Sequence, residues 1–178
     1  MHYTCYSNFR TESKGLAIFD RDGTLIYDIK GLADPKLAVW LPERLQTLRY
    51  LTQMGYMIAI ASNQGAIEEN LLSEKEVQAV NLEIVLQANK HGIEIWSAIY
   101  CPHGKNLGGR FCNCRKPKAG MLIDLFEKSN LPRESKVAFF GDKETDIVAA
   151  ANSNLAIEGI LVNEQNFSSE VKKWAVHA

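Results

Sequence analysis

Two aspartates, Asp20 and Asp22, stand two residues apart directly after the short apolar run 16–19. In such a pair, one carboxylate can attack a phosphorus atom, while the other protonates the leaving oxygen and later activates water. Gly23 lets the backbone turn sharply and approach a ligand. A solvated turn would have the same composition, so the interpretation needs support from other parts of the chain.

Other polar residues follow later apolar runs or precede a helix. They are Ser62, Lys116, Asp142 and Asp146. A serine hydroxyl can hold a phosphate oxygen, a lysine can neutralise phosphate charge, and carboxylates are the ligands that Mg²⁺ prefers. Each residue alone has an ordinary explanation, as a cap, a solvated cation or an acid at a helix start. Together they favour phosphoryl transfer, which depends on positioning and on neutralising charge.

Apolar runs of strand length alternate along the chain with segments of helical periodicity. Strands are predicted at 16–19, 57–61, 95–100, 137–140 and 160–162. Helices are predicted from Pro42 to before Gly55, after a capping box at Ser73 and Glu76, from Pro117, and at the surface from Ser168.

This alternation predicts a three-layer, doubly wound α/β fold with a mostly parallel sheet. Ligands of such sheets bind at the carboxyl ends of the strands, where the polar residues above lie. We expect one domain over 15–178, preceded by an N-terminal extension over 1–14. The gaps from Asp20 to Ser62 and from Ser62 to Lys116 are about forty and fifty residues, too short for a cap domain.

A second group of chemically active residues lies just before Lys116. Its members are Cys101, His103, Cys112 and Cys114. Their C-x-H and C-x-C spacing across a short loop suits tetrahedral Zn²⁺, and four protein ligands indicate a structural ion. Buried cysteines beside a surface histidine are the simpler alternative. A zinc-stabilised loop would fix the backbone of Lys116, two residues beyond the last ligand.

The composition is that of a soluble globular protein. The 178 residues are 46% hydrophobic and 23% charged, and the formal net charge is −1. This balance argues against a broad nucleic-acid-binding surface. No apolar run approaches the roughly 18 residues of a membrane span, and residues 1–14 lack the apolar core of a secretory signal. We therefore expect a cytoplasmic monomer without membrane or nucleic-acid partners.

In order, these motifs resemble those of the haloacid dehalogenase (HAD) superfamily of phosphatases. The matching residues are Asp20-x-Asp22-Gly23-Thr24, Ser62, Lys116 and Gly141-Asp142-x-x-x-Asp146. The resemblance implies that Asp20 is the nucleophile and Asp22 the general acid and base. It also implies a catalytic Mg²⁺ held by Asp20, the backbone carbonyl of Asp22 and Asp142, with Asp146 in support. The implied substrate-binding residues are Ser62, Asn63, Arg115 and Lys116.

The cysteine loop followed by Arg115-Lys116-Pro117 resembles one HAD branch. That branch includes D-glycero-D-manno-heptose 1,7-bisphosphate phosphatases and histidinol-phosphate phosphatases. The segment 116–122 is more similar to the heptose enzymes, and 141–146 to the histidinol enzymes. We expect the heptose bisphosphate as substrate and keep histidinol phosphate as the alternative.

Charged residues near the motifs bear on this choice. The loop brings Lys105, Arg110 and Arg115 close to Lys116 in sequence, and these cations favour a substrate with a second anionic group. Glu68 and Glu69 follow the second predicted strand and would favour a cationic substrate if they reached the site.

Three readings from other classes compete with a small-molecule phosphatase. A polynucleotide 3′-phosphatase would share the HAD motifs but would favour a basic groove, which the balanced charge does not indicate. A non-catalytic, zinc-containing HAD-like binding protein would be expected to lose a nucleophile or metal ligand, yet Asp20 and Asp142 are present. A metal-binding interaction module would leave the acids unexplained.

Overall fold

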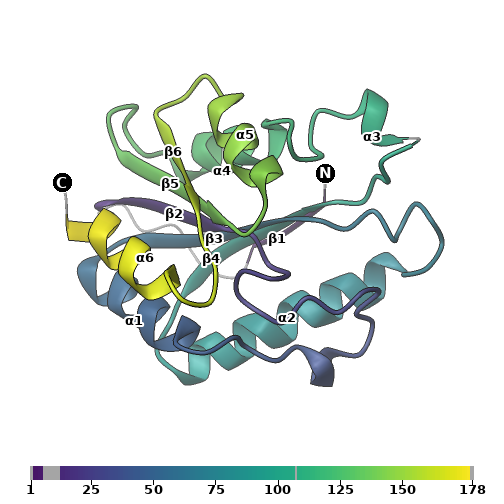
Figure 1. The fold of residues 1–178 in the computed structure, drawn as a ribbon, viewed down its shortest axis with the longest axis horizontal. Coiled ribbons are helices and arrows are strands. Elements are labelled where there is room, and N and C mark those ends of the chain that lie inside the picture. Colours follow the sequence, from purple (N-terminus) through teal and green to yellow (C-terminus); the bar gives the residue numbers. More distant parts are fainter. Residues whose placement is uncertain (1, 6–12, 107, 177–178) are drawn as a thin grey trace.

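The computed structural model describes residues 2–5, 13–106 and 108–176 of the chain. Six strands form one sheet in the spatial order β1-β4-β3-β2-β5-β6 (Figure 1). The strands are β1 His2–Cys5, β2 Gly15–Phe19, β3 Met57–Asn63, β4 Ile95–Cys101, β5 Lys136–Gly141 and β6 Ile157–Leu161. All neighbours are parallel except β1, which joins the edge antiparallel to β4. The predicted mostly parallel sheet is therefore confirmed.

Helices cover both faces of the sheet, which confirms the three-layer, doubly wound fold (Figure 1). One face carries α1 Arg44–Met54, α2 Glu74–Lys90 and α6 Phe167–Val176, and the other carries α4 Gly120–Ser129 and α5 Glu144–Ala151. The chain leaves β2 to β3 on one side and returns to β5 on the other. This reversal beside β2 creates a crevice at the carboxyl ends of the strands.

The central strand β2 is buried on both faces. Leu16 and Ile18 pack in the apolar cluster beneath α4 and α5, whereas Ala17 and Phe19 pack in the cluster beneath α1, α2 and α6. Alternate side chains point to opposite faces, so a strand between two helical layers is apolar throughout. This explains why β2 has no polar residue until Asp20.

Two local end signals form as the sequence predicts. Gly55 ends α1 in the left-handed conformation at φ 87°, where glycine carries no Cβ penalty. Ser73 and Glu76 form a reciprocal capping box at the start of α2.

The helix predicted from Pro117 begins at Gly120 instead. Residues 115–118 form a turn in which the Lys118 backbone N–H donates to Arg115 O at 2.8 Å. The Gly120 backbone N–H donates to Asn113 O, so the first turn of α4 is tied to the cysteine loop. These contacts to a neighbouring loop override the local preference of proline for a first helical turn.

The C-terminal helix predicted at the surface forms as α6, and one of its faces belongs to the core. In α6, Phe167, Val171 and Trp174 are buried, an i, i+4, i+7 stripe that packs on the sheet. The Tyr56 hydroxyl donates to Ala175 O at 3.0 Å and ties the end of the helix to the start of β3.

The last strand, predicted at 160–162, runs over Ile157–Leu161. The sequence pattern missed its first residues because Glu158 and Gly159 interrupt the apolar run. Between β2 and β3 the described chain forms the short helix η1 Pro35–Leu37, α1 and two isolated β-bridges at Ile26, so no cap domain lies there. The division of the chain at residue 14 stays a prediction. Within the described residues, no helix has the length and apolar character needed to cross a membrane.

Candidate active site

The carboxyl ends of β2, β3 and β5 meet at one crevice. Asp20 follows β2, and its backbone N–H donates to Phe140 O at 2.9 Å. Asn63 ends β3, and Asp142 follows β5. A cavity of about 130 Å³ opens between them; its lining residues are Asp20, Asp22, Asp28, Asn63, Lys116, Lys143, Thr145 and Asp146.

Three carboxylates converge in this crevice. One oxygen from each of Asp20, Asp142 and Asp146 lies within 4.8 Å of the others. Opposite ligands of an octahedral Mg²⁺ stand roughly 4.2 Å apart, so the group fits a hard cation with little adjustment. The Asp22 carboxylate is not part of this group.

Asp142 is placed by the turn that follows Asp20. Gly23 has φ 82°, and a Cβ at this position would lie 2.6 Å from Asp142 Oδ2, so only glycine allows the close approach. The Thr24 hydroxyl donates to Asp142 Oδ1 at 3.3 Å. Burial raises the pKa of Asp142, which Lys143 opposes and Asp20 and Asp146 reinforce. Lys143 Nζ lies 3.6 Å from Asp142 Oδ2 and compensates only part of the negative charge at this point.

Lys116 is the buried cation of the site. Its Nζ lies 2.7 Å from Asp20 Oδ1 and 2.8 Å from Asp146 Oδ1, and it also donates to Ala61 O at 2.9 Å. Burial alone would lower the pKa of Lys116, but the two carboxylates outweigh it and raise the pKa above its ordinary value. Lys116 is thus a fixed positive charge beside the Asp20 carboxylate.

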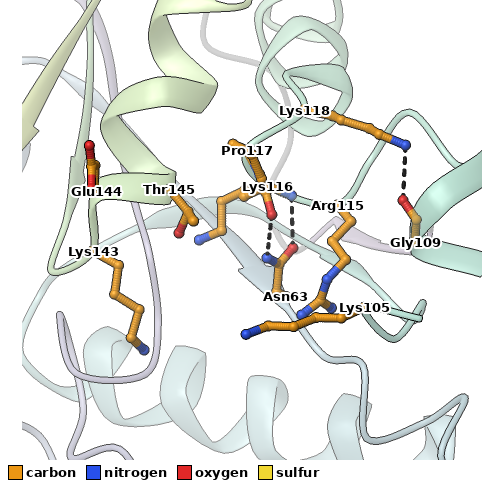
Figure 2. Close-up of a pocket in the computed structure, with 10 residues that line it drawn as sticks. All are labelled: Asn63, Lys105, Gly109, Arg115, Lys116, Pro117, Lys118, Lys143, Glu144 and Thr145. Carbon is orange, nitrogen blue, oxygen red and sulfur yellow. Dashed lines mark hydrogen bonds between the residues drawn. The ribbon is translucent and has the colours of Figure 1, made fainter. Parts of the chain in front are cut away.

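Asn63 holds the backbone of Lys116 in register. Its Oδ1 accepts from the Lys116 N–H at 3.0 Å, and its Nδ2 donates to Lys116 O at 3.1 Å (Figure 2). Ser62 is buried one residue earlier, and its hydroxyl accepts from Gln64 Nε2 at 3.4 Å. Asn63 is among the residues that line the crevice, whereas Ser62 is not among its described lining residues. The assignments of Ser62 and Asn63 to substrate binding stay predictions.

Asp22 is held by two residues that the sequence reasoning missed as site residues, Arg21 and Gln64. Arg21 Nη2 donates to Asp22 Oδ2 at 2.9 Å, and Gln64 Nε2 donates to the same oxygen at 2.8 Å. Arg21 is itself buried, and its Nη1 donates to Asn81 Oδ1 on α2 at 2.9 Å. The sequence signal that could have found Arg21 is its position directly after a buried strand, because a buried charge needs a partner of opposite charge.

A larger cavity of about 680 Å³ adjoins the crevice (Figure 2). The cationic side chains that line it are Lys105, Arg115, Lys116, Lys118 and Lys143, and Glu144 is its one acidic lining residue among those described. Arg115 Nη1 donates to His103 O at 2.5 Å, and Lys143 Nζ lies 3.3 Å from Asp28 Oδ2. Arg110, which the sequence placed with these cations, is exposed outside the described cavity lining.

The predicted zinc ligands also come together. Cys101 Sγ lies 3.9 Å from Cys112 Sγ, and His103 Nδ1 lies 3.5 Å from Cys101 Sγ and 3.4 Å from Cys114 Sγ. Ligand atoms around tetrahedral Zn²⁺ stand roughly 3.5–3.8 Å apart, so the arrangement fits this ion. Cys114 and Cys101 are closer, at 3.1 Å, and their hydrogen bond lowers the pKa of Cys114 and raises that of Cys101. The four atoms form a group that could hold a metal ion.

Comparison with known proteins gives a consistent result. The family described as polynucleotide kinase 3 phosphatase matches residues 15–176. The D-glycero-beta-D-manno-heptose-1,7-bisphosphate 7-phosphatase of Pseudomonas putida is 33% identical over 137 residues, covering 76% of this chain and 75% of that protein. The D-glycero-alpha-D-manno-heptose-1,7-bisphosphate 7-phosphatase of Campylobacter jejuni is 31% identical and covers 85% of each chain.

Solved structures agree with these relatives. The D,D-heptose 1,7-bisphosphate phosphatase of B. bronchiseptica, complexed with magnesium and phosphate, is similar with a TM-score of 0.72 and 29% identity, covering 80% of this chain and 78% of that one. A HAD-like protein of Mesorhizobium loti has a TM-score of 0.84 at 20% identity, covering 97% of this chain and 91% of that one, which shows the shared fold alone.

Proposed function

We propose that this chain, which belongs to the polynucleotide kinase 3 phosphatase family and is a HAD-type phosphatase, hydrolyses a small sugar phosphate, with D-glycero-D-manno-heptose 1,7-bisphosphate as the preferred substrate. The observation that carries the proposal is the Asp20 carboxylate, buried at the end of β2 between the Lys116 ammonium and two further carboxylates.

Asp20 is the nucleophile. It attacks the phosphorus atom and forms an aspartyl-phosphate, while Asp22 gives a proton to the departing sugar oxygen. Asp22 then takes a proton from the water that hydrolyses this intermediate. Lys116 holds Asp20 in position and balances the charge that the phosphoryl group brings.

Asp20, Asp142 and the backbone carbonyl of Asp22 would hold the catalytic Mg²⁺, with Asp146 in support. Bound there, the ion neutralises charge so that an anionic carboxylate can approach an anionic phosphate. The convergence of three carboxylates supports this assignment, because Lys116 and the half-exposed Lys143 together supply one positive charge fewer than the three carboxylates carry.

The cationic lining of the larger cavity supports a substrate with a second anionic group. Lys105, Arg115 and Lys143 surround the space beside the crevice (Figure 2). A sugar bisphosphate offers a second phosphate to these side chains, whereas the ammonium of histidinol phosphate would be repelled. The cavity thus disfavours histidinol phosphate, which we keep as the alternative substrate that the sequence suggests.

The family description names a polynucleotide phosphatase, and this is the second candidate function. An open, cation-lined cavity beside the nucleophile would also accept a nucleic-acid end. The two curated relatives described above act, by name, on a heptose bisphosphate, which favours the sugar.

We also propose that Cys101, His103, Cys112 and Cys114 bind one structural Zn²⁺. Near-tetrahedral spacing and four protein ligands support this role. A cytoplasmic location, a monomeric state and the absence of membrane partners remain predictions from the sequence.

A panel of phosphate esters with Mg²⁺ tests the proposal. It contains heptose 1,7-bisphosphate, histidinol phosphate and a 3′-phosphorylated oligonucleotide. We expect kcat/KM for the heptose bisphosphate to exceed the other two by at least about tenfold, which is about 1.4 kcal/mol of transition-state preference. If kcat/KM for one of the other two substrates is higher than that for the heptose bisphosphate by the same factor, that substrate replaces the heptose bisphosphate as the proposed one.

A further inference from the structure

Glu68, which the sequence left as a possible substrate contact, binds the cysteine loop instead. Its Oε2 accepts from the Gly104 N–H at 2.6 Å, and its Oε1 accepts from the Gly108 N–H at 2.8 Å. Its own backbone N–H donates to Pro102 O at 3.2 Å. Each carboxylate oxygen thus accepts a hydrogen bond from a different loop amide.

Lys118 binds the same loop from the other side. Its Nζ donates to Gly109 O at 2.9 Å, as Figure 2 shows. It also donates to Arg110 O at 2.9 Å and to Cys112 O. Lys118 is the last residue of the turn 115–118, which precedes the start of α4 at Gly120. The Glu68 carboxylate therefore accepts hydrogen bonds from loop N–H groups, while the Lys118 ammonium donates hydrogen bonds to loop carbonyls.

These contacts enclose the one-turn helix α3 Gly108–Phe111, which lies between the two halves of the ligand set. So short a helix leaves its backbone groups without partners of their own, and side chains must satisfy them. The Phe111 side chain is 89% exposed, so it does not anchor α3 to the core. Charged hydrogen bonds of this kind are stronger than neutral ones and suit the task.

We propose that Glu68 and Lys118 are positioning residues that hold the cysteine loop in its metal-binding geometry. The proposal rests on the zinc site of the proposed function, and it extends to the substrate rim. Arg115 reaches the loop through His103 O, so loosening the loop displaces this cation. Lys116 is held by Asn63 and Ala61 on β3 and keeps its place.

The test compares Glu68→Gln with Glu69→Gln in the full chain. A glutamine at 68 keeps one acceptor oxygen but turns an N–H₂ toward the second loop amide. Glu69 is exposed, and its carboxylate accepts no hydrogen bond from a described residue, which makes it the matched control. The zinc dissociation constant is measured with a competing chelator, and KM and kcat are measured separately.

We expect Glu68→Gln to bind zinc about 10–100-fold more weakly, the usual cost of losing an outer contact to a metal site. We also expect a higher KM with little change in kcat. Lys118→Met should shift both quantities in the same direction, while Glu69→Gln should match the wild type. Far-UV circular dichroism checks that each variant is folded.

Wild-type zinc affinity in folded Glu68→Gln and Lys118→Met would overturn the proposal, as would an equal effect of Glu69→Gln. Weaker zinc binding with an unchanged KM would overturn its extension to the rim. Zinc affinity is measured without substrate, so failure of the phosphatase assignment would leave this result readable.

Discussion

The Lys116 ammonium lies 2.7 Å from a carboxylate oxygen of Asp20, a buried ion pair between residues 96 positions apart. The contact joins the turn after the cysteine loop to the end of the central strand. Asp146 completes the pair at 2.8 Å from Lys116, so one cation serves two acids. Removing it would leave two buried carboxylates without their partner.

Lys116→Met should therefore destabilise the fold by about 3–5 kcal/mol, the usual cost of breaking a buried ion pair from one side. Lys128→Met is the matched control, because the Lys128 side chain is 52% exposed and its i,i+4 pair with Asp124 is worth about 0.5 kcal/mol or less. Urea unfolding measures both. Equal midpoints for the two variants would show that the Lys116 pair contributes no more than a surface contact.

Asp142→Asn should have opposite effects on stability and on metal binding. Without Mg²⁺, the variant should be more stable than the wild type by on the order of 0.5 kcal/mol, the scale of a screened charge pair. It removes one of three converging carboxylates while an amide oxygen can still accept from Thr24. Mg²⁺ should raise the Tm of the wild type and leave that of the variant nearly unchanged.

The pH dependence of this gain follows from the pKa of Asp142, which burial raises despite Lys143. A raised pKa in the folded state means that ionisation of Asp142 costs stability as pH rises above its ordinary value of 3.8. The advantage of Asp142→Asn should thus be full at neutral pH and vanish below about 3.8. A gain that persists in acid would assign it to packing instead of charge.

Cys112→Ser should remove the zinc and lower the thermal stability of the protein. Elemental analysis of native protein should find about one zinc per chain, as a four-ligand site implies, and much less in the variant. The ion is expected to be separate from the catalytic metal, so added Mg²⁺ should not restore the lost stability. Native protein without zinc would refute the assignment.

Trp174→Ala tests the burial of α6. Trp174 packs against Tyr56 and Phe140, so its loss should cost about 3–5 kcal/mol. Val176→Ala on the same helix removes an exposed side chain and should change stability by about 0.5 kcal/mol or less. A small effect of Trp174→Ala in urea unfolding would show that the buried face of α6 contributes little to stability.

Local signals were sufficient to predict much of this fold. The apolar run before Asp20, the glycine after α1 and the capping box at Ser73 each act within a few residues of chain. The convergence of Asp20, Asn63 and Asp142 also followed, because carboxyl ends of parallel strands meet at one edge.

Contacts between distant segments were beyond the reach of sequence patterns. The start of α4 depends on a hydrogen bond from Gly120 to the cysteine loop. The two partners of the Glu68 carboxylate, Gly104 and Gly108, lie 36 and 40 residues away in the chain. Without them, the charge of Glu68 alone suggested a substrate contact. Arg21 looked like a spacer between two acids, although its guanidinium orients one of them.

The most direct test of the central claim is phosphate release from heptose 1,7-bisphosphate with Mg²⁺, compared between the wild type and Asp20→Asn. The amide cannot form an aspartyl-phosphate, so the variant should release no detectable phosphate while its circular dichroism spectrum shows a folded protein. The wild type should release phosphate and lose this activity in EDTA. A folded Asp20→Asn variant that turns over at the wild-type rate would contradict the role of Asp20 as the nucleophile.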